Sequence, residues 1–206
     1  MNQLIIMLSA IVLAAGLSKR MGSVNKLLLT YKNKTVTETV VENILAAGIE
    51  EVIVVTGHQS GMVEDVLKKI PVTTVHNPYY EKGMTTSIQA GLQYATGSGY
   101  MICLSDMVLL KPEDYSTLKT AFEQQVQVNE NCICIPIFNS QKGNPVIFSS
   151  FYQQLILENE YMDGCKNIVT AYKENVHLVQ MNTSNILADI DYPEDYKKLN
   201  GFTGSQ

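Results

Sequence analysis

Three basic side chains follow the first strongly apolar segment of the chain at short intervals. Lys19, Arg20 and Lys26 come after the small-residue run Ala14-Ala15-Gly16. Small side chains leave backbone N–H groups open to a ligand, and cations neutralise phosphate oxygens. This pattern predicts a loop that binds a nucleoside triphosphate, in which Arg20 and Lys26 touch phosphate and Lys19 faces solvent or is auxiliary. The alternative is an ordinary exposed loop of small and basic residues.

The spacing of this loop excludes the two commonest phosphate-binding motifs. It has no Gly-x-Gly-x-x-Gly, and Lys26 does not stand in Gly-x-x-x-x-Gly-Lys-Ser/Thr. The loop is therefore of a different kind from those of dinucleotide-binding proteins and P-loop enzymes.

Acidic residues at two distant places could hold a divalent cation beside such a loop. Asp106 comes directly after the apolar run 101–104, and Asp189 and Asp191 alternate on a short segment near the C-terminus. Mg²⁺ takes one or two protein carboxylates together with phosphate oxygens and water. We expect Asp106 and either Asp191 or Asp189 to form a Mg²⁺ site, because alternate residues of an extended segment share a face. The alternatives are a turn-capping role for Asp106 and helix-dipole complementation by the later acids.

Apolar strand-like runs alternate along the chain with segments of helical periodicity. The expected strands are residues 10–15, 51–56, 72–76, 100–104 and 132–137, and the expected helices lie at 36–45, about 85–95, 112–126 and from Pro193 onward. This alternation predicts an α/β fold: a Rossmann-like three-layer domain with a mostly parallel sheet covered on both faces.

Four of the expected strands end in loops that carry candidate site residues. These loops are the small-residue run, Gly57-His58, the segment 77–83 and Ser105-Asp106. Ligands of open α/β sheets bind beyond the carboxyl ends of the strands. We therefore expect the four loops to line one pocket.

Length and composition predict one domain over residues 1–206, with residues 1–7 an extra or frayed N-terminus and 202–206 a loose tail. The chain has 46% hydrophobic residues, enough for one well-packed core. Its net charge of −5 argues against a nucleic-acid-binding surface. Cys103, Cys132, Cys134 and Cys165 show no Cys-x-x-Cys spacing, so we expect reduced cysteines in the core.

The apolar run 4–17 resembles a signal peptide or membrane anchor only superficially. No Lys or Arg precedes it, and it is shorter than the roughly 20 residues that span a bilayer. We expect a cytoplasmic protein that binds no membrane.

The motifs together resemble the MobA-like nucleotidyltransferases over nearly the whole chain. The first motif is Leu-Ala-Ala-Gly-x-Ser-x-Arg-Met-Gly-x-x-x-Lys-Leu-Leu, which begins at Leu13. Family-like segments recur in the same order at Lys82-Gly83-Met84-Thr85-Thr86-Ser87, Leu104-Ser105-Asp106-Met107, Gly143-Asn144-Pro145-Val146 and Asp189-Ile190-Asp191-Tyr192-Pro193-Glu194-Asp195. The resemblance implies a fold of the nucleotide-diphospho-sugar transferase type.

The resemblance also implies roles for individual residues. The nucleotide-binding residues would be Leu13, Ala14, Ala15, Gly16, Arg20, Lys26, Gly83, Thr86 and Ser87. Arg20, Lys26 and Asp106 would be catalytic, Asp106 and Asp191 would bind Mg²⁺, and Asn144 would bind the acceptor. The chain departs from the family pattern at Ser105, Val108 and Tyr192, and Asn144 stands where the family pattern has histidine.

The function that the resemblance implies is Mg²⁺-dependent transfer of CMP from CTP to the phosphate of molybdopterin cofactor, with release of pyrophosphate. Ala14-Ala15 favours CTP, because guanylyl-transferring relatives typically have Gly-Gly there. A phosphate nucleophile is already ionised, so His58 and His76 are not needed as bases. The alternatives are transfer to a sugar phosphate or another small phosphorylated acceptor, and a non-catalytic carrier of the cofactor. A receiving molybdoenzyme is a further implied partner.

Overall fold

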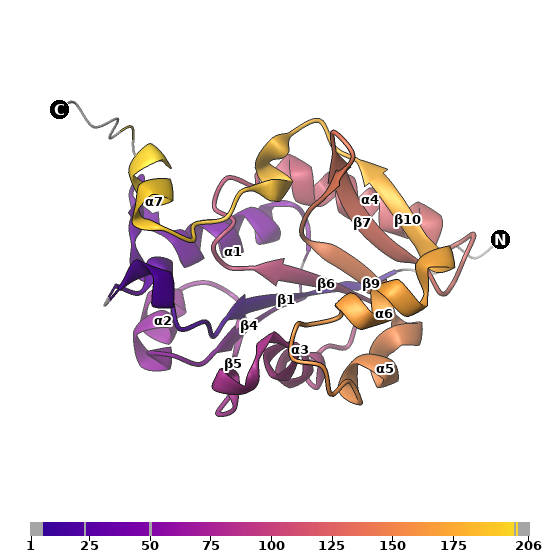
Figure 1. The fold of residues 1–206 in the computed structure, drawn as a ribbon, viewed down its shortest axis with the longest axis horizontal. Coiled ribbons are helices and arrows are strands. Elements are labelled where there is room, and N and C mark those ends of the chain that lie inside the picture. The colour runs from indigo at the N-terminus through magenta and orange to yellow at the C-terminus, as the bar shows by residue number, and fades with distance from the viewer. Residues whose placement is uncertain (1–5, 23, 50, 200, 202–206) are drawn as a thin grey trace.

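A mostly parallel β-sheet forms the centre of the computed structural model, which describes residues 6–22, 24–49, 51–199 and 201 (Figure 1). The strand order is β10-β7-β9-β6-β1-β4-β5, with β8 paired to β7. The strands are β1 Leu8–Ala14, β4 Glu51–Thr56, β5 Thr73–His76, β6 Gly99–Leu104, β7 Ile133–Phe138, β8 Gln141–Lys142, β9 Val146–Ser149 and β10 Val176–Gln180. The five strands expected from the sequence all form, within two residues of their predicted ends.

The central strand β1 is parallel to both of its neighbours. Ala10 pairs with Val52 of β4 and with Met101 of β6. On the other side of β6, β9 is antiparallel to both β6 and β7, and β10 is parallel to β7. A short antiparallel pair, β2 Thr30–Tyr31 and β3 Lys34–Thr35, lies apart from the main sheet. Strands β8, β9 and β10 are not predicted from the sequence, and the antiparallel pairing of β8 and β9 makes the sheet mixed.

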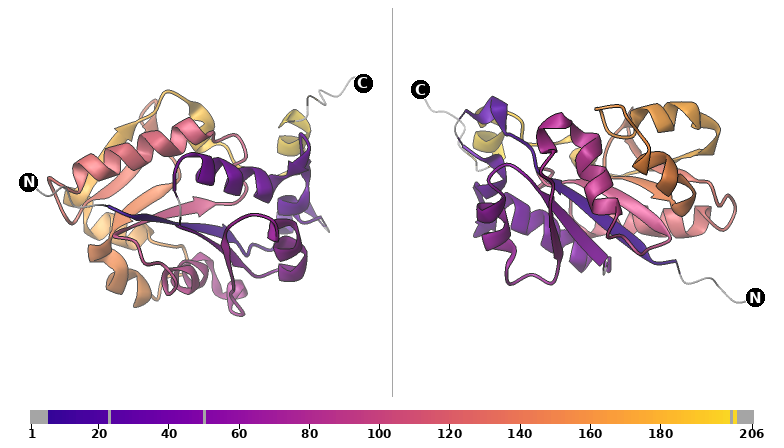
Figure 2. Two further views of the ribbon diagram at one scale, coloured as in Figure 1. Left: turned by 180° about the vertical axis from the view of Figure 1, so that it is seen from behind. Right: turned by 90° about the horizontal axis from the view of Figure 1, so that it is seen from below.

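Helices cover both faces of the sheet (Figures 1 and 2). One hydrophobic cluster includes residues of α1, α2 and α4, with Tyr196 and Leu199 of α7 packed against it, and the other includes residues of α3, α5 and α6. The helices are α1 Val36–Ala46, α2 Ser60–Leu67, α3 Met84–Leu92, α4 Pro112–Gln125, α5 Gln153–Leu157, α6 Lys166–Ala171 and α7 Pro193–Leu199. This is the predicted three-layer arrangement.

Local signals explain where the predicted helices begin. At the start of α1 the Thr35 hydroxyl accepts the Glu38 N–H while the Glu38 carboxylate accepts the Thr35 N–H, which satisfies two free donors of the first turn. Helix α4 begins at Pro112, a position where proline costs no backbone hydrogen bond, and Asp114 accepts the Lys111 N–H.

Short 3-10 turns join several of these elements. They are η1 Lys19–Met21, η2 Lys26–Leu28, η3 Tyr80–Lys82, η4 Ser150–Tyr152, η5 Lys173–Asn175 and η6 Ser184–Leu187. Two of them, η1 and η2, carry the three basic side chains that follow β1. The chain therefore leaves β1 in tight turns that hold the basic residues near the strand end.

The four cysteines are buried and free, as expected. The expected frayed start and loose tail fall largely outside the described residues, although the Met7 carbonyl accepts a hydrogen bond from the Ser98 N–H at 2.8 Å. Among the residues described, no helix is long and apolar enough to cross a bilayer.

Candidate active site

A cavity of about 480 Å³ opens at the carboxyl ends of β1 and β6. Its walls come from residues 15–20 after β1, from Lys26 and Leu27 of η2, from the β5–α3 connection, from Ser105 and Asp106 after β6, and from Asp191 before α7. Helices α3 and α7 belong to opposite faces of the sheet. The cavity is thus bounded by elements of both faces, at the edge where parallel sheets bind ligands.

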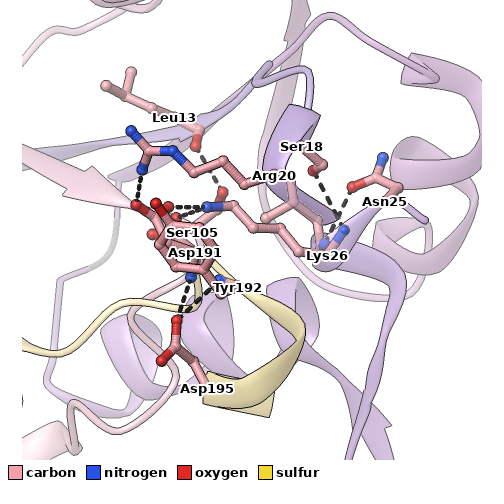
Figure 3. Close-up of polar contacts among 11 residues, drawn as sticks. Leu13, Ser18, Arg20, Asn25, Lys26, Ser105, Asp191, Tyr192 and Asp195 are labelled. Atoms are coloured by element: carbon pink, nitrogen blue, oxygen red, sulfur yellow. Dashed lines mark hydrogen bonds and ion pairs between the residues drawn. The ribbon is translucent and has the colours of Figure 1, made fainter. Parts of the chain in front are cut away.

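Lys26 joins the two acids that the sequence analysis paired. Its Nζ lies 2.5 Å from Asp106 Oδ2 and 3.0 Å from Asp191 Oδ1. The turn η2 holds the lysine in place, because the Asn25 side chain accepts the Leu27 N–H at 3.1 Å and the Ser18 hydroxyl accepts the Lys26 N–H at 3.3 Å (Figure 3). A cation therefore lies between one carboxylate from the middle of the chain and one from its C-terminal part.

This ion pairing shifts the pKa values of its members. Burial alone would lower the pKa of Lys26, but the charges and hydrogen bonds of Asp106 and Asp191 outweigh it and raise the pKa above its ordinary value. Burial opposes ionisation of Asp191, yet the hydrogen bond from Lys26 and the charges of Lys26 and Arg20 lower its pKa. Near neutral pH the lysine is therefore a cation and Asp191 an anion.

Arg20 reaches the same carboxylate from the other side. Its guanidinium donates to Asp191 Oδ2, and its Cζ lies 5.6 Å from the centre of the Tyr192 ring (Figure 3). Asp195 accepts the backbone N–H groups of Asp191 and Tyr192 at 3.2 and 2.9 Å. At Tyr192, where the chain departs from the family pattern, Asp195 thus supplies the cap of α7 and the tyrosine ring packs against Arg20.

Asp189 joins Asp106 and Asp191 in a cluster of three carboxylates. One oxygen of each lies within 4.8 Å of the others. Partial burial, together with the charges of Asp106 and Asp191, raises the pKa of Asp189. The Oδ1 atom of Asp106 is buried and accepts no hydrogen bond from the described residues. Hard oxygen ligands at this spacing and one unsatisfied carboxylate oxygen fit a divalent cation of the Mg²⁺ type.

The small-residue loop is held close to the strands on either side of it. The Ser105 hydroxyl donates to the Leu13 carbonyl at 2.6 Å, which ties the end of β6 to the end of β1. Ala15 and Gly16 line the cavity, whereas Ala14 is fully buried in the core. Of the two alanines, only Ala15 lines the cavity.

Gly57-His58 was expected to line the pocket, and this expectation is wrong. The two residues lie behind the loop, where the His58 N–H donates to the Ala15 carbonyl at 3.3 Å. A Cβ atom on Gly57 would lie 2.7 Å from Tyr80 and 2.8 Å from Ala15. The end of β4 supports the pocket wall, and the absence of a side chain at position 57 allows that wall to pack closely.

The β5–α3 connection forms the wall nearest to α3. Gly83 and Ser87 line the cavity together with Met84 and with Tyr80 and Glu81, which belong to the segment 77–83 that was expected there. Thr86 points elsewhere, since its hydroxyl hydrogen-bonds with the Tyr79 and Gly83 carbonyls. Met84 appeared in the sequence analysis only as part of the family-like segment 82–87, so no signal marked it individually.

The remaining candidates divide between the cavity and other places. Lys19 is exposed to solvent, as expected, and it also lines the cavity. Asn144 does not line the cavity, and its backbone N–H donates to the Ile186 carbonyl at 3.0 Å. The structure therefore brings together Leu13, Ala15, Gly16, Arg20, Lys26, Gly83, Ser87, Asp106 and Asp191, and leaves Ala14, Thr86 and Asn144 outside.

A cavity at the strand ends of an α/β sheet, with cations and clustered carboxylates around it, is suited to an enzyme that binds a phosphorylated ligand together with a metal ion. The family model described as "MobA-like NTP transferase domain" matches residues 10–176. The chain belongs to this family and is a nucleotidyltransferase.

Two curated relatives and one solved structure illustrate the likeness. The chain is 25% identical over 191 residues, 92% of its length and 93% of the relative's, to molybdenum cofactor cytidylyltransferase of Escherichia coli. It is 34% identical over 110 residues, 51% of its length and 49% of the relative's, to a probable molybdenum cofactor guanylyltransferase of Methanosarcina mazei. A nucleotidyl transferase from Methanothermobacter thermautotrophicus has the same fold, with a TM-score of 0.80, 24% identity and coverage of 95% and 97% of the two chains.

Proposed function

We propose that this protein transfers CMP from CTP to the phosphate of molybdopterin cofactor and that the reaction uses a divalent cation, Mg²⁺. The observation that carries the proposal is the position of Lys26, which lies between Asp106 and Asp191 at the mouth of a cavity next to a small-residue loop. Such a rim can hold both the anionic substrates and the cation that accompanies them. The nearly full-length similarity to the cytidylyltransferase of Escherichia coli supports the choice of substrates.

The reaction requires little covalent chemistry from the protein. An oxygen of the acceptor phosphate attacks the α-phosphorus of CTP, a new P–O bond forms, and the bond between the α-phosphorus and its bridging oxygen breaks to release pyrophosphate. The attacking oxygen is already ionised, so no general base is needed. Arg20, Lys26 and Lys19 would neutralise the charge on the triphosphate and on the departing pyrophosphate.

The cation would be held by Asp106 and Asp191, with Asp189 close enough to contribute an oxygen directly or through water. When bound, a divalent cation polarises phosphoryl oxygens and offsets the charge that builds up on the leaving group. Burial and the charges of Asp106 and Asp191 raise the pKa of Asp189. A divalent cation in the cluster would offset these charges and favour the ionised form of Asp189. Lys26 would then be released toward the phosphates.

Ala15 is the residue that we propose as the nucleotide selector of the small-residue loop. Ala15 lines the cavity and its Cβ faces Gly57, whereas Ala14 is enclosed in the core. Packed between the loop and Gly57, the Ala15 methyl group would set how far the loop backbone lies from the opposite wall, and in this way it would limit the room for a base. This supports a pyrimidine in preference to a purine.

The experiment is a measurement of pyrophosphate release from CTP and from GTP, each with Mg²⁺ and molybdenum cofactor, with Asp106→Asn as the blank. We expect release from CTP by the wild-type protein and none by the variant, in which nucleotide still binds. Undiminished turnover by the variant would show that Asp106 is not a ligand of the cation. Transfer from GTP alone would overturn the choice of nucleotide.

The same assay separates the alternatives. Release that proceeds with sugar phosphates at fixed CTP, and not with molybdenum cofactor, would move the acceptor to another phosphorylated compound. Nucleotide or cofactor binding without release would indicate a carrier. The three clustered carboxylates favour the enzyme over the carrier, since holding a finished product needs no cation site.

A further inference from the structure

A buried asparagine after β5 links two neighbouring hydroxyl groups at the start of α3. Asn77 is 2% exposed, and its Nδ2 donates to Thr86 Oγ1 and to Ser87 Oγ, at 3.0 Å each. Its Oδ1 accepts the backbone N–H of Tyr79 at 2.9 Å. Because a backbone N–H can only donate, the amide oxygen must face Tyr79, and the NH₂ group must face the two hydroxyls.

This orientation decides which way each hydroxyl proton points. The oxygen of Thr86 accepts from Asn77, and its proton goes to the carbonyl of Tyr79 or Gly83, at 3.0 Å each. The oxygen of Ser87 accepts from Asn77 as well, but no described residue accepts the Ser87 proton. Ser87 is 4% exposed and lines the cavity. Its O–H is therefore a buried donor available to whatever fills the cavity.

The surroundings of Ser87 indicate which part of a nucleotide would lie beside it. Leu13, Leu104 and Met84 line the same cavity, and they are apolar. The cations and carboxylates come instead from the loop after β1, from the end of β6 and from the segment before α7. Phosphates are matched to the charged residues, and a planar base with ring acceptors is matched to an apolar wall that carries one oriented hydroxyl.

We propose that Asn77 is a positioning residue that fixes Ser87 as a hydrogen-bond donor to the base of the bound nucleotide. Cytosine offers O2 and N3 as acceptors for this proton. The inference rests on the proposed function, because it assumes that the substrate is a nucleoside triphosphate. It adds that the protein donates, and the base accepts, the hydrogen bond between them. A site with an oriented donor discriminates against ligands that lack the matching acceptor, because the buried hydroxyl would then stay unpaired.

The test replaces the NH₂ group of Asn77, a hydrogen-bond donor, with a carboxylate oxygen, which is an acceptor. In Asn77→Asp one carboxylate oxygen still accepts the Tyr79 N–H, but the other becomes an acceptor, so the Ser87 proton turns toward it and away from the cavity. Dissociation constants are measured for CTP and, as a probe without a base, for inorganic tripolyphosphate. The ratio of the two constants cancels the repulsion that the added charge exerts on any polyphosphate.

We expect the ratio to shift about tenfold against CTP in Asn77→Asp and in Ser87→Ala. In the double variant the shift should be no larger than in Ser87→Ala alone, because Asn77 acts through the serine. KM for CTP should rise with kcat nearly unchanged. Asn43→Asp is the matched control. Asn43 does not line the cavity, and its side chain donates to the Leu110 carbonyl over a distance of 2.8 Å. This substitution should leave the ratio unchanged.

An unchanged ratio in Asn77→Asp, or independent shifts that add in the double variant, would overturn the inference while leaving the proposed function intact. If the wild-type protein uses GTP instead, the proposed choice of nucleotide fails, and the same ratio measured with GTP still decides the inference. If the wild-type protein binds tripolyphosphate as tightly as either nucleotide, no base contact exists and the inference is wrong.

Discussion

Lys26 lies between Asp106 and Asp191, the two carboxylates that we propose as ligands of the divalent cation. Replacing it with glutamine removes a positive charge that competes with the metal. We expect Lys26→Gln to bind Mn²⁺ about tenfold more tightly in the absence of nucleotide, a change of about 1.4 kcal/mol. Titration of the free protein followed by electron paramagnetic resonance measures this affinity. Nucleotidyl transfer should fall by about 10²-fold or more, because a preorganised cation is lost.

The exposed Lys19 provides the comparison for this prediction. It lines the same cavity but forms no ion pair with Asp106 or Asp191 among the described residues. Lys19→Gln should change Mn²⁺ affinity much less than Lys26→Gln. Equal or weaker metal binding by Lys26→Gln would show that the lysine does not stand in the cation's place.

The two alanines of the loop have different surroundings, and this separates two effects of substitution. Ala15 is the proposed nucleotide selector, so we expect Ala15→Gly to lower the preference for CTP over GTP by about tenfold, as expected for loss of one methyl group. Ala14→Gly should instead lower the free energy of unfolding by about 1 to 2 kcal/mol, because a buried methyl is lost and the chain gains freedom. Competition between the two nucleotides in the transfer assay measures the preference. A preference that moves only in Ala14→Gly would contradict the assignment.

Helix α3 depends on a glycine for its close approach to the sheet. A Cβ atom on Gly91 would lie 2.5 Å from Ile11 Cγ2 and 2.8 Å from Val55 Cγ2, both in the core. We expect Gly91→Ala to lower the free energy of unfolding by about 1 to 3 kcal/mol through overpacking. Gly61 in α2 meets no atom within 4 Å, so Gly61→Ala should raise stability by up to about 1 kcal/mol. Urea denaturation measures both, and destabilisation of equal size in both would contradict the packing explanation.

Sequence patterns predicted the central elements and missed the outer ones for a physical reason. The strands β1, β4 and β6 are nearly fully buried, and burial leaves a continuous apolar run that can be recognised. Three of the five residues of β10 are exposed and its sequence does not alternate cleanly, and β9 has only four residues after a proline. Their strand character comes from pairing with β7 and β6, which no local pattern contains.

The residues of the candidate site also differ in whether a local sequence pattern could reveal them. Spacing within one segment identified Arg20, Lys26 and Asp106, because each belongs to a short motif at a strand end. The ion pair of Arg20 with Asp191 joins residues 171 positions apart, and only the assembled fold brings them together. The orientation of Asn77 depends on three contacts from two elements, so it was not predictable from residue type.

Glu51 links several parts of the whole molecule. Its carboxylate accepts hydrogen bonds from the Ser9 hydroxyl of β1, the Thr96 hydroxyl at 2.7 Å and the Thr96 N–H at 2.9 Å. Burial opposes ionisation, but these hydrogen bonds outweigh it and lower the pKa of Glu51 below its ordinary value of 4.5. The ionised form therefore stabilises the fold above about pH 4.5, and this contribution is lost as the pH falls through the lower pKa of the folded state.

Glu51→Gln should accordingly weaken the dependence of stability on pH. We expect the free energy of unfolding to be about 1 kcal/mol lower than in the wild type at pH 7, and the difference to shrink toward pH 3. The measurement is urea denaturation at a series of pH values. Glu130→Gln, at an exposed position, is the matched control and should follow the wild-type curve. A constant difference at all pH values would mean that the carboxylate charge contributes nothing.

Lys26 and Asp191 are 165 residues apart, and this distance has a consequence for biosynthesis. At about 5 to 20 residues per second, Lys26 leaves the ribosome roughly 10 to 30 s before its partner is made. A nascent chain that has reached β10 carries the cationic loop and the strands of the main sheet, but it lacks Asp189 and Asp191. The proposed metal-binding cluster is thus completed only in the final stage of translation, so the proposed reaction would have to wait for the last residues of the chain.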